Sequence, residues 1–550
     1  MRRHGMMFAA ALAVGTSFTI AIGAIALAAP APSTPAPNSP QGLAAAAYTA
    51  MGNVDHYSGE GTPPEQLVII TTRGTTQQWE PGESESVADL TKPDGGTSTF
   101  VNIWDRTRTV FRTEWSRPRP AGGMRTYTEI YSVEGGYVLG NDANGAPPRR
   151  TVQGNPPVHT MSSLRLRALL REQERAGIVF SMHDHPDRIY DYPAQTVGGK
   201  RYPAVQFRGD NATFIVMFDP ATHFPAVVRT RDFDQHMGDA DFDATYSDWR
   251  DVGKFKQPYH VVYTLNGFKL FDTTVNQITV NTNLAADAFR APPALRGKAA
   301  LPAPIGKPNY QWILRRLASG FNLDSEAVYG DDGAQMALTD VGPNISLFTG
   351  GSHNTLVVAT NNSLIAFEAP GDDGLSKLVI DAAAKKYPGK PFKYVVLTHH
   401  HIDHSGGVRA YAAEGATIVV GKGDGAFFRK VLSAPQGLNP YGVKSVAPKV
   451  IEVDGKWSVN EGGRAIEAYL IESPHAAGYL IPYVPDAKMG FVTDIWGPGA
   501  PVNNVNPAQV ALVREVAKAG ITPEKFAGGH GSVGNYSDLT QAVQRQGGGR

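Results

Sequence analysis

Cysteine is absent from the sequence, which has 550 residues. Disulfides, iron–sulfur clusters, thiolate zinc sites and cysteine nucleophiles are therefore all excluded. Any transition-metal site in this chain must be built from histidine and carboxylate side chains.

The chain also lacks an excess of charge of either sign. Lys and Arg number 51, and Asp and Glu number 51, so the formal net charge is zero. A chain without net positive charge exerts no overall attraction on nucleic acid or anionic lipid, and we expect no nucleic-acid partner. The length exceeds what one ordinary core accommodates, which predicts two or more domains.

Long apolar runs are missing everywhere except at the N-terminus. There, Arg2 and Arg3 precede an apolar run that reaches residue 27, and small residues stand at its end, at Ala26 and Ala28. This pattern predicts a signal peptide over residues 1–28 and a periplasmic or secreted mature protein beginning at Ala29. A membrane anchor is the alternative, and the export route, general secretory or twin-arginine, stays open. We expect no membrane span once the signal is removed.

The composition of the chain divides the rest into four parts. Residues 29–45 are rich in proline and alanine and predict a linker. Residues 46–296 hold many short stretches of Val, Ile, Thr and aromatic residues, which predict an antiparallel β-rich domain with one helix over 162–176. The tetrapeptide Leu265-Asn266-Gly267-Phe268 predicts a tight hairpin. Residues 297–335 predict a linker with a short helix, and 336–545 alternate strands with helices, as α/β domains do.

The end of the β-rich part carries a resemblance of its own. The segment 246–253, the hairpin and the segment 287–292 resemble the curved sheets of periplasmic lipoprotein carriers. This resemblance implies a concave apolar surface for a lipid or another hydrophobic ligand.

Four histidines fall within six positions of the α/β part. They stand in the run Thr398-His399-His400-His401-Ile402-Asp403-His404, after a strand and before a helix. In an extended chain His399 and His401 point the same way, and Asp403 and His404 project from the following turn. Imidazole and carboxylate in this density suit Zn²⁺, and packing alone does not explain them. By contrast, His183 and His185 precede a proline without strand context, and we interpret them as part of a loop.

Further motifs follow in order along the chain. They are the loop Glu472-Ser473-Pro474-His475, the strand Gly490-Phe491-Val492-Thr493-Asp494, and the loop Gly528-Gly529-His530-Gly531. With the histidine run they resemble the metallo-β-lactamase superfamily over about residues 336–543. The resemblance implies an α/β (αββα) sandwich preceded by the antiparallel β-rich domain. Glu368 stands where family members often have an aspartate, a position that supports the metal loop.

The resemblance implies two metal ions, zinc in the first place, with iron or manganese as alternatives. The first metal would be bound by His399, His401 and His475, the second by Asp403, His404 and His530, and Asp494 would bridge them. Two cations about 3.5–4 Å apart need such an anion, and they share a water whose pKa falls toward neutrality. The catalytic residues would be Asp494 and also Asp403, if it passes a proton to the leaving group. His353, near the expected mouth of the site, is a candidate substrate contact.

These observations predict an exported dinuclear zinc-dependent hydrolase that uses a metal-bridging hydroxide on a small-molecule substrate. We expect an ester, thioester or lactone, because β-lactamases of this family generally lack the bridging aspartate. Three alternatives remain: hydrolysis of a β-lactam, phosphodiester or sulfate ester at the same site, an iron-dependent redox enzyme on the same scaffold, and a carrier of a hydrophobic ligand with a structural metal domain. Di-iron members of the family place a glutamate at the position of His401, which argues against the iron-dependent redox alternative.

Overall fold

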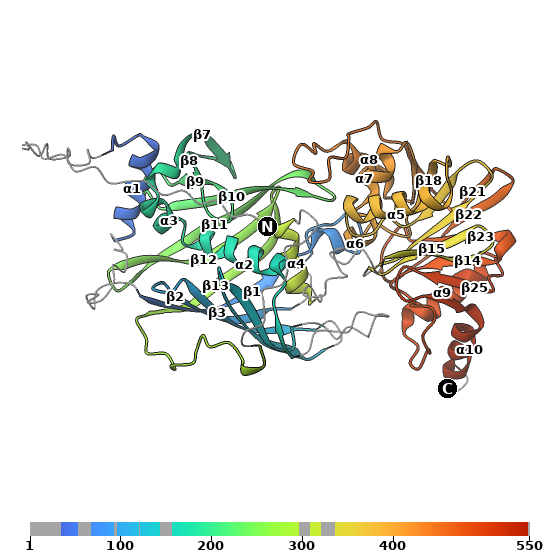
Figure 1. Ribbon diagram of the computed structural model, residues 1–550, viewed down its shortest axis with the longest axis horizontal. Coiled ribbons are helices and arrows are strands. Elements are labelled where there is room, and N and C mark those ends of the chain that lie inside the picture. Colours follow the sequence, from blue (N-terminus) through green and yellow to red (C-terminus); the bar gives the residue numbers. More distant parts are fainter. Residues whose placement is uncertain are drawn as a thin grey trace, which may run out of the picture.

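The computed structural model describes residues 35–52, 68–92, 96–119, 122–142, 157–295, 309–320, 336–351 and 353–547. The predicted signal peptide, residues 1–28, lies outside the described residues. Two regions lie side by side along the long axis of the molecule, an N-terminal region dominated by one sheet and a C-terminal region of two sheets with helices (Figure 1). Among the described residues, no helix is both long enough and apolar enough to cross a membrane.

One antiparallel sheet of 13 strands forms the N-terminal region, in the order β6-β5-β4-β3-β2-β1-β13-β12-β11-β10-β9-β8-β7. Its strands are β1 (Ile69–Gln78), β2 (Ser98–Asp105), β3 (Val110–Pro118), β4 (Met124–Ser132), β5 (Gly135–Gly140), β6 (Val158–Thr160), β7 (Ile189–Val197), β8 (Lys200–Arg208), β9 (Thr213–Phe218), β10 (Pro225–Asp234), β11 (Gly238–Val252), β12 (Phe255–Leu265) and β13 (Phe268–Val280). The predicted β-rich domain is thus present. The hairpin falls where it was predicted, because Asn266 and Gly267 both adopt the positive φ angles that a tight two-residue turn requires.

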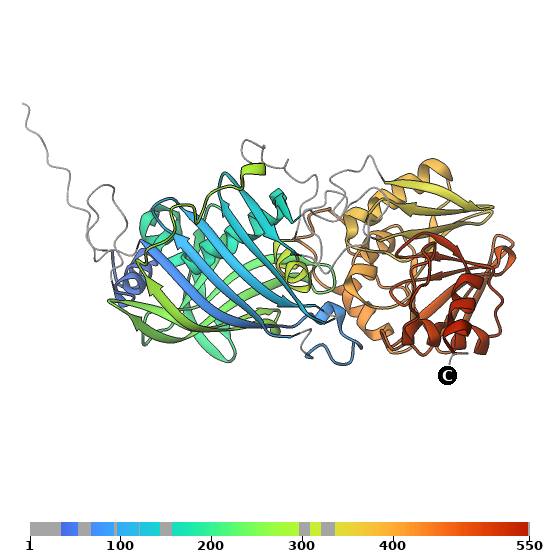
Figure 2. The ribbon, with the colours of Figure 1, turned by 90° about the horizontal axis from the view of Figure 1, so that it is seen from below.

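Helices cover the apolar face of this sheet (Figure 2). They are α1 (Pro40–Ala50), α2 (Ser163–Ala176) and α3 (Ile178–Asp184). Ala47 of α1 and Val179 and Phe180 of α3 pack with Phe207 and Val216 of the sheet. The chain's own side chains thus cover this face, and a hydrophobic ligand stays a prediction.

Two local expectations are corrected. The linker predicted over 29–45 ends earlier, because α1 begins at Pro40: Ser39 caps the helix by accepting the N–H of Gly42, and the alanines that follow favour a helix. His183 lies in helix α3, not in a loop, and its ring stacks on Tyr48 at 3.8 Å. Three further helical segments of the N-terminal region are short: η1 (Pro81–Glu83), η2 (Pro186–Arg188) and η3 (Pro293–Leu295).

Helix α4 (Tyr310–Ser319) lies in the stretch predicted to be a linker with a short helix. It packs against α2 through an apolar cluster that includes Leu164, Ile313 and Leu317. The same cluster contains Ile402 of the histidine run, so α4 joins the two regions.

The C-terminal region has two sheets packed face to face. The first, β14 to β20 in sequence order, consists of β14 (Ala337–Gly342), β15 (Ile345–Thr349), β16 (Thr355–Ala359), β17 (Leu364–Phe367), β18 (Phe392–Val396), β19 (Thr417–Gly421) and β20 (Val450–Val453). The second, also in sequence order, consists of β21 (Lys456–Glu461), β22 (Arg464–Leu470), β23 (Leu480–Val484), β24 (Met489–Val492), β25 (Lys525–Gly528) and β26 (Val533–Asn535). Leu356, Val396, Leu480 and Phe491, all fully buried, belong to the core between them.

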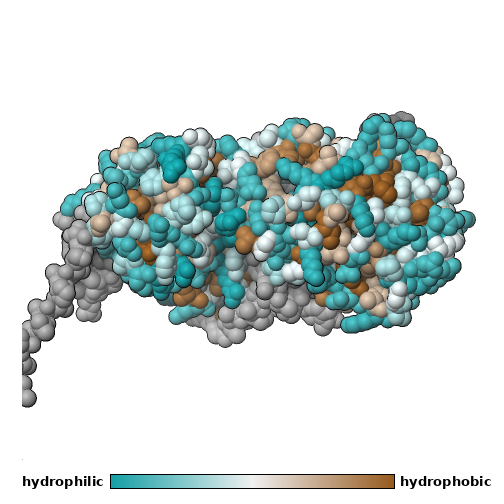
Figure 3. Space-filling model, turned by 90° about the horizontal axis from the view of Figure 1, so that it is seen from above, coloured by the Kyte–Doolittle hydropathy of each residue, from teal (hydrophilic) through white to brown (hydrophobic). Residues whose placement is uncertain are grey.

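Helices cover the outer face of each sheet. The helices on the first sheet are α5 (Asp373–Lys386), α7 (Val408–Ala413) and α8 (Gly425–Ser433), those on the second are α9 (Pro507–Lys518) and α10 (Tyr536–Gly547), and η6 (Pro485–Ala487) lies in a turn. The short helix α6 (Ile402–Ser405) follows β18 and packs through Ile402 in the cluster that contains α4. This is the predicted αββα sandwich. On the face in Figure 3, hydrophobic residues form small groups separated by hydrophilic ones.

Candidate metal centre

The ends of three strands position the predicted metal ligands. The histidine run follows β18, Asp494 follows β24, and His530 follows β25, next to β24 in the second sheet. The strands β17 to β20 run parallel, as do β24 and β25. The carboxyl ends of such strands meet at one edge, which is where α/β folds bind ligands.

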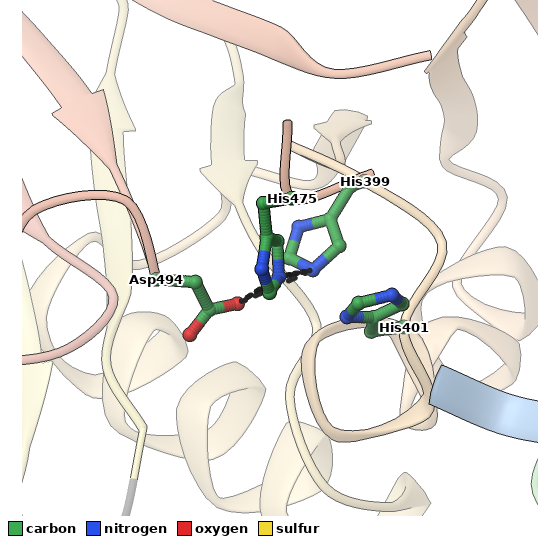
Figure 4. Close-up of side chains that lie close together, drawn as sticks. All are labelled: His399, His401, His475 and Asp494. Carbon is green, nitrogen blue, oxygen red and sulfur yellow. Dashed lines mark hydrogen bonds and ion pairs between the residues drawn. The ribbon is translucent and has the colours of Figure 1, made fainter. Parts of the chain in front are cut away.

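The three side chains predicted for the first metal meet Asp494 there. The Nε2 atoms of His399 and His475 lie 3.2 Å apart, and both lie close to Asp494 Oδ2, at 3.3 and 3.0 Å (Figure 4). Donors on a tetrahedral zinc ion are separated by roughly 3.3 Å, given Zn–N distances of about 2.0–2.1 Å. These three atoms therefore already have the spacing of metal ligands. His401 belongs to the same group, with one donor atom within 4.8 Å of the others.

The side chains predicted for the second metal also meet at Asp494, where His404 shares Oδ2 with the first group. His404 Nε2 lies 2.9 Å from Asp494 Oδ2, and His530 Nε2 lies 2.9 Å from Asp494 Oδ1. Asp403 Oδ1 lies 3.7 Å from His404 Nε2. Asp403 Oδ1 is buried and has no hydrogen-bond partner among the described residues. A buried acceptor without a partner is costly in a protein, and a metal ion bound beside it would satisfy it.

Hydrogen bonds to the far ring nitrogens leave the near ones free to bind metal. His404 Nδ1 contacts Glu368 Oε2 at 2.5 Å. His399 Nδ1 contacts Thr398 Oγ1 at 3.0 Å, and this hydroxyl donates to Glu368 Oε1. His401 Nε2 donates to the carbonyl oxygen of Ser84 at 3.0 Å, which leaves Nδ1 free. Such partners fix the tautomer and orientation of metal-binding histidines. Glu368, at a φ of 75°, thus supports the metal loop.

Charges set the protonation of the carboxylates. Burial raises the pKa of Asp494, but the charges of His404 and His530 outweigh it and hold that pKa well below its usual range. Burial and the neighbouring His401 lower the pKa of His399 well below its usual range. An ionised carboxylate beside a neutral imidazole is the combination that binds zinc.

Two other histidines have distinct places. His400 points away from the centre, because its Nε2 donates to Ser84 O at 2.8 Å and its Nδ1 faces Asp424 at 4.0 Å. His353, the predicted substrate contact, is buried in the second group: its Nε2 lies 3.3 Å from Asp403 Oδ2, and it offers a donor atom within 4.8 Å of those of His404 and His530. It lies among the predicted ligands.

The N-terminal region supplies residues that the sequence did not reveal. Glu83 of η1 lies 3.6 Å from His401 Nδ1, and Arg316 of α4 contacts Asp403 Oδ2 at 2.9 Å. Figure 4 shows a blue segment of the N-terminal region beside His401. Neither residue stands in a motif, and each is more than 80 positions from the side chain it contacts, so no local signal identifies it.

The sequence comparison agrees with this geometry. Residues 344–521 match the family model of the metallo-beta-lactamase superfamily. The C-terminal region therefore belongs to this superfamily, as the four motifs predicted. His530 lies beyond the end of the match. A search of curated proteins found no match to the chain.

Several solved structures resemble part of the chain. A metallo-beta-lactamase from Pontibacter korlensis is 19% identical over 38% of this chain and 98% of that one, with a TM-score of 0.30. The sec-alkylsulfatase Pisa1 from Pseudomonas sp. is 16% identical over 38% of this chain and 41% of that one, with a TM-score of 0.30. The Flv1 flavodiiron core from Synechocystis sp. is 15% identical over 38% of this chain and 60% of that one, with a TM-score of 0.31.

Proposed function

We propose that this protein is an exported dinuclear zinc-dependent hydrolase. The observation that carries the proposal is the place of Asp494, whose Oδ2 lies within 3.3 Å of His399, His475 and His404 and whose Oδ1 lies 2.9 Å from His530. An anion in this position offsets the repulsion between two adjacent cations. Zinc ions bound here would supply a water of lowered pKa as nucleophile and would polarise the bond under attack.

The chain's own residues hold the ligands for this chemistry. Glu368 orients His404, Thr398 orients His399, and Ser84 orients His401. Burial raises the pKa of Asp403, but the charges of His404 and Arg316 outweigh it and keep that pKa well below its usual range. A carboxylate that stays ionised supports a role for Asp403 as a ligand of the second metal more than as a proton donor.

A small ester, thioester or lactone is the proposed substrate. The presence of Asp494 in the bridging position supports this class over β-lactams. The arginine that contacts the predicted ligands, Arg316, is 3% exposed and pairs with Glu83 and Asp403, so its charge is already engaged. This pairing supports an uncharged acyl substrate over a phosphodiester or sulfate ester.

The test is a comparison of kcat/KM on an aryl ester, an acyl lactone, a β-lactam, an aryl phosphodiester and an alkyl sulfate with one zinc-loaded preparation. We expect the ester or lactone to be the best substrate, and activity to disappear on chelation and return with zinc. A β-lactam value near ~10⁷ M⁻¹s⁻¹, with all others far lower, would overturn the substrate assignment. An iron-loaded protein that consumes oxygen and hydrolyses none of the substrates would favour the redox alternative.

Export is a separate part of the proposal. It rests on Arg2, Arg3 and the apolar run that ends before Ala29. N-terminal sequencing of protein recovered from outside the cytoplasm should begin near Ala29, and a chain that still begins at Met1 would contradict it.

A further inference from the structure

An arginine from the N-terminal region reaches the predicted metal centre. Arg316 of α4 lies between two carboxylates: its Nη2 contacts Asp403 Oδ2 at 2.9 Å, and its Nη1 contacts Glu83 Oε1 at 2.7 Å. The side chain is 3% exposed. Figure 1 shows α4 and α6 at the junction of the two regions, and η1 contacts α6 there.

The two oxygens of Asp403 have different surroundings. Oδ2 accepts from Arg316 and lies 3.3 Å from His353 Nε2. Oδ1 has no hydrogen-bond partner among the described residues and lies 3.7 Å from His404 Nε2. The guanidinium therefore holds one oxygen, and the other faces the second ligand group.

The fold holds Arg316 firmly in this place. The preceding residue, Arg315, is buried and pairs with Glu80 and, at 2.9 Å, with Asp234, which fixes α4 to the β-rich region. Trp312 of α4 packs in one cluster with Ile402, the residue before Asp403. Burial, two partners and a packed helix leave the guanidinium little freedom.

The short segment that carries Glu83 packs closely against the histidine run at Gly82. A Cβ at Gly82 would lie 2.8 Å from Ile402 Cγ2, so only glycine permits this approach. Two residues on, the carbonyl oxygen of Ser84 accepts from both His400 and His401. The same short segment thus places the counter-ion of Arg316 and fixes a ligand histidine.

We propose that Arg316 is a positioning residue of the metal centre: it holds Asp403 with Oδ1 directed at the second metal. The N-terminal region then takes part in the metal centre, because its Arg316 holds Asp403 and the carbonyl oxygen of its Ser84 accepts from His401. The inference rests on the two-metal centre of the proposed function, but not on hydrolysis.

The test measures zinc binding to the full-length mature chain by competition with a chromophoric chelator. Arg316→Met keeps the length of the side chain and removes its charge and donors. We expect the affinity for the second zinc to fall about 10- to 100-fold, the range typical of lost partners of metal ligands, while the first zinc binds as in the wild type. Arg175→Met is the matched control, since this arginine of α2 is also buried but pairs with Glu172 and Thr230 and with no predicted ligand; it should lower stability and leave both affinities unchanged.

A double-mutant cycle shows whether the effect passes through Asp403. In an Asp403→Asn background, Arg316→Met should cause no further loss of the second zinc. If Arg316→Met does not fold, Arg316→Lys carries the test: it keeps the charge but loses the fork that joins Glu83 to Asp403, and we expect a smaller but selective loss. Wild-type affinity for the second zinc in the arginine variants would overturn the inference, whereas a wild type that binds fewer than two zinc ions would overturn the proposed function.

Discussion

The Nε2 atoms of His399 and His475 lie 3.2 Å apart, although 76 positions separate the two residues in the sequence. Two protonated imidazoles would repel one another at this distance, and the pKa of His399 is indeed held well below its usual range by burial and by His401. Two ring nitrogens this close together, with Asp494 Oδ2 at 3.0 to 3.3 Å from both, have the spacing of donors to one metal ion.

Replacement of His401 tests the first metal. His401→Ala removes a donor of the first group, so we expect loss of the first metal and a fall in kcat/KM of at least about 10³-fold, because the nucleophile depends on the metal pair. Metal content and hydrolysis of the best substrate are the measurements. His185→Ala, at the end of α3 and remote from the centre, should change neither. Full metal content in His401→Ala would exclude this residue as a ligand.

Replacement of Glu368 tests the support of the second metal. Its carboxylate accepts from Thr398 at one oxygen and from His404 Nδ1 at the other. Glu368→Gln puts an N–H₂ group at one of these contacts, so we expect the second metal to bind about 10- to 100-fold more weakly. Glu461→Gln is the control, because Glu461 is also buried and accepts from Ser363 and Lys393 but contacts no predicted ligand. Equal zinc affinity in the two variants would contradict the assigned role.

A buried carboxyl outside the ligand set predicts a pH dependence of stability. Asp424 precedes α8, and burial together with the charge of Glu452 raises its pKa to about 8. The folded state then binds a proton that the unfolded state releases at about pH 4, so the free energy of unfolding falls as the pH rises from about 4 to about 8. Asp424→Asn has no carboxyl to ionise here, so its free energy of unfolding should lack this decrease with pH.

Urea unfolding at pH 5 and pH 8 is the measurement. At pH 8 we expect the free energy of unfolding of Asp424→Asn to exceed that of the wild type by about 2 kcal/mol or more, since each pKa unit corresponds to about 1.4 kcal/mol. The difference should be clearly smaller at pH 5. Asp454 is 72% exposed and pairs with Lys422, so Asp454→Asn should have a free energy of unfolding within about 0.5 kcal/mol of the wild type at both pH values. The same gain at both pH values would show that the carboxyl ionises without penalty.

The sequence predicted much of this centre because its ligands lie in local patterns. His399, His401, Asp403 and His404 fall within one turn after a strand, and Asp494 closes a recognisable strand. The parallel strands that precede them then fix their meeting point. His353 was identified only by its place before a strand, and its proximity to His404 and His530 emerged from the fold.

The remaining parts depend on contacts between distant segments. Glu83 and Arg316 are separated by 233 positions, and neither periodicity nor a motif connects them. Helix α1 was missed because its N-cap, Ser39, stands at the end of a proline-rich stretch that favours an extended chain. Strand β5 is rich in glycine, and strand β6 has only three residues. Neither has a clear strand pattern of its own, and their neighbours in the sheet stabilise them.

We expect one chain to bind two metal ions, with Asp494 as their shared carboxylate ligand. Elemental analysis of the purified mature protein, reconstituted with zinc and freed of excess metal, tests it most directly. We expect two zinc ions per chain in the wild type and a lower content in Asp494→Asn, because the bridging charge is lost. A zinc content well below one per chain in the reconstituted wild type would show that no two-metal centre forms at Asp494.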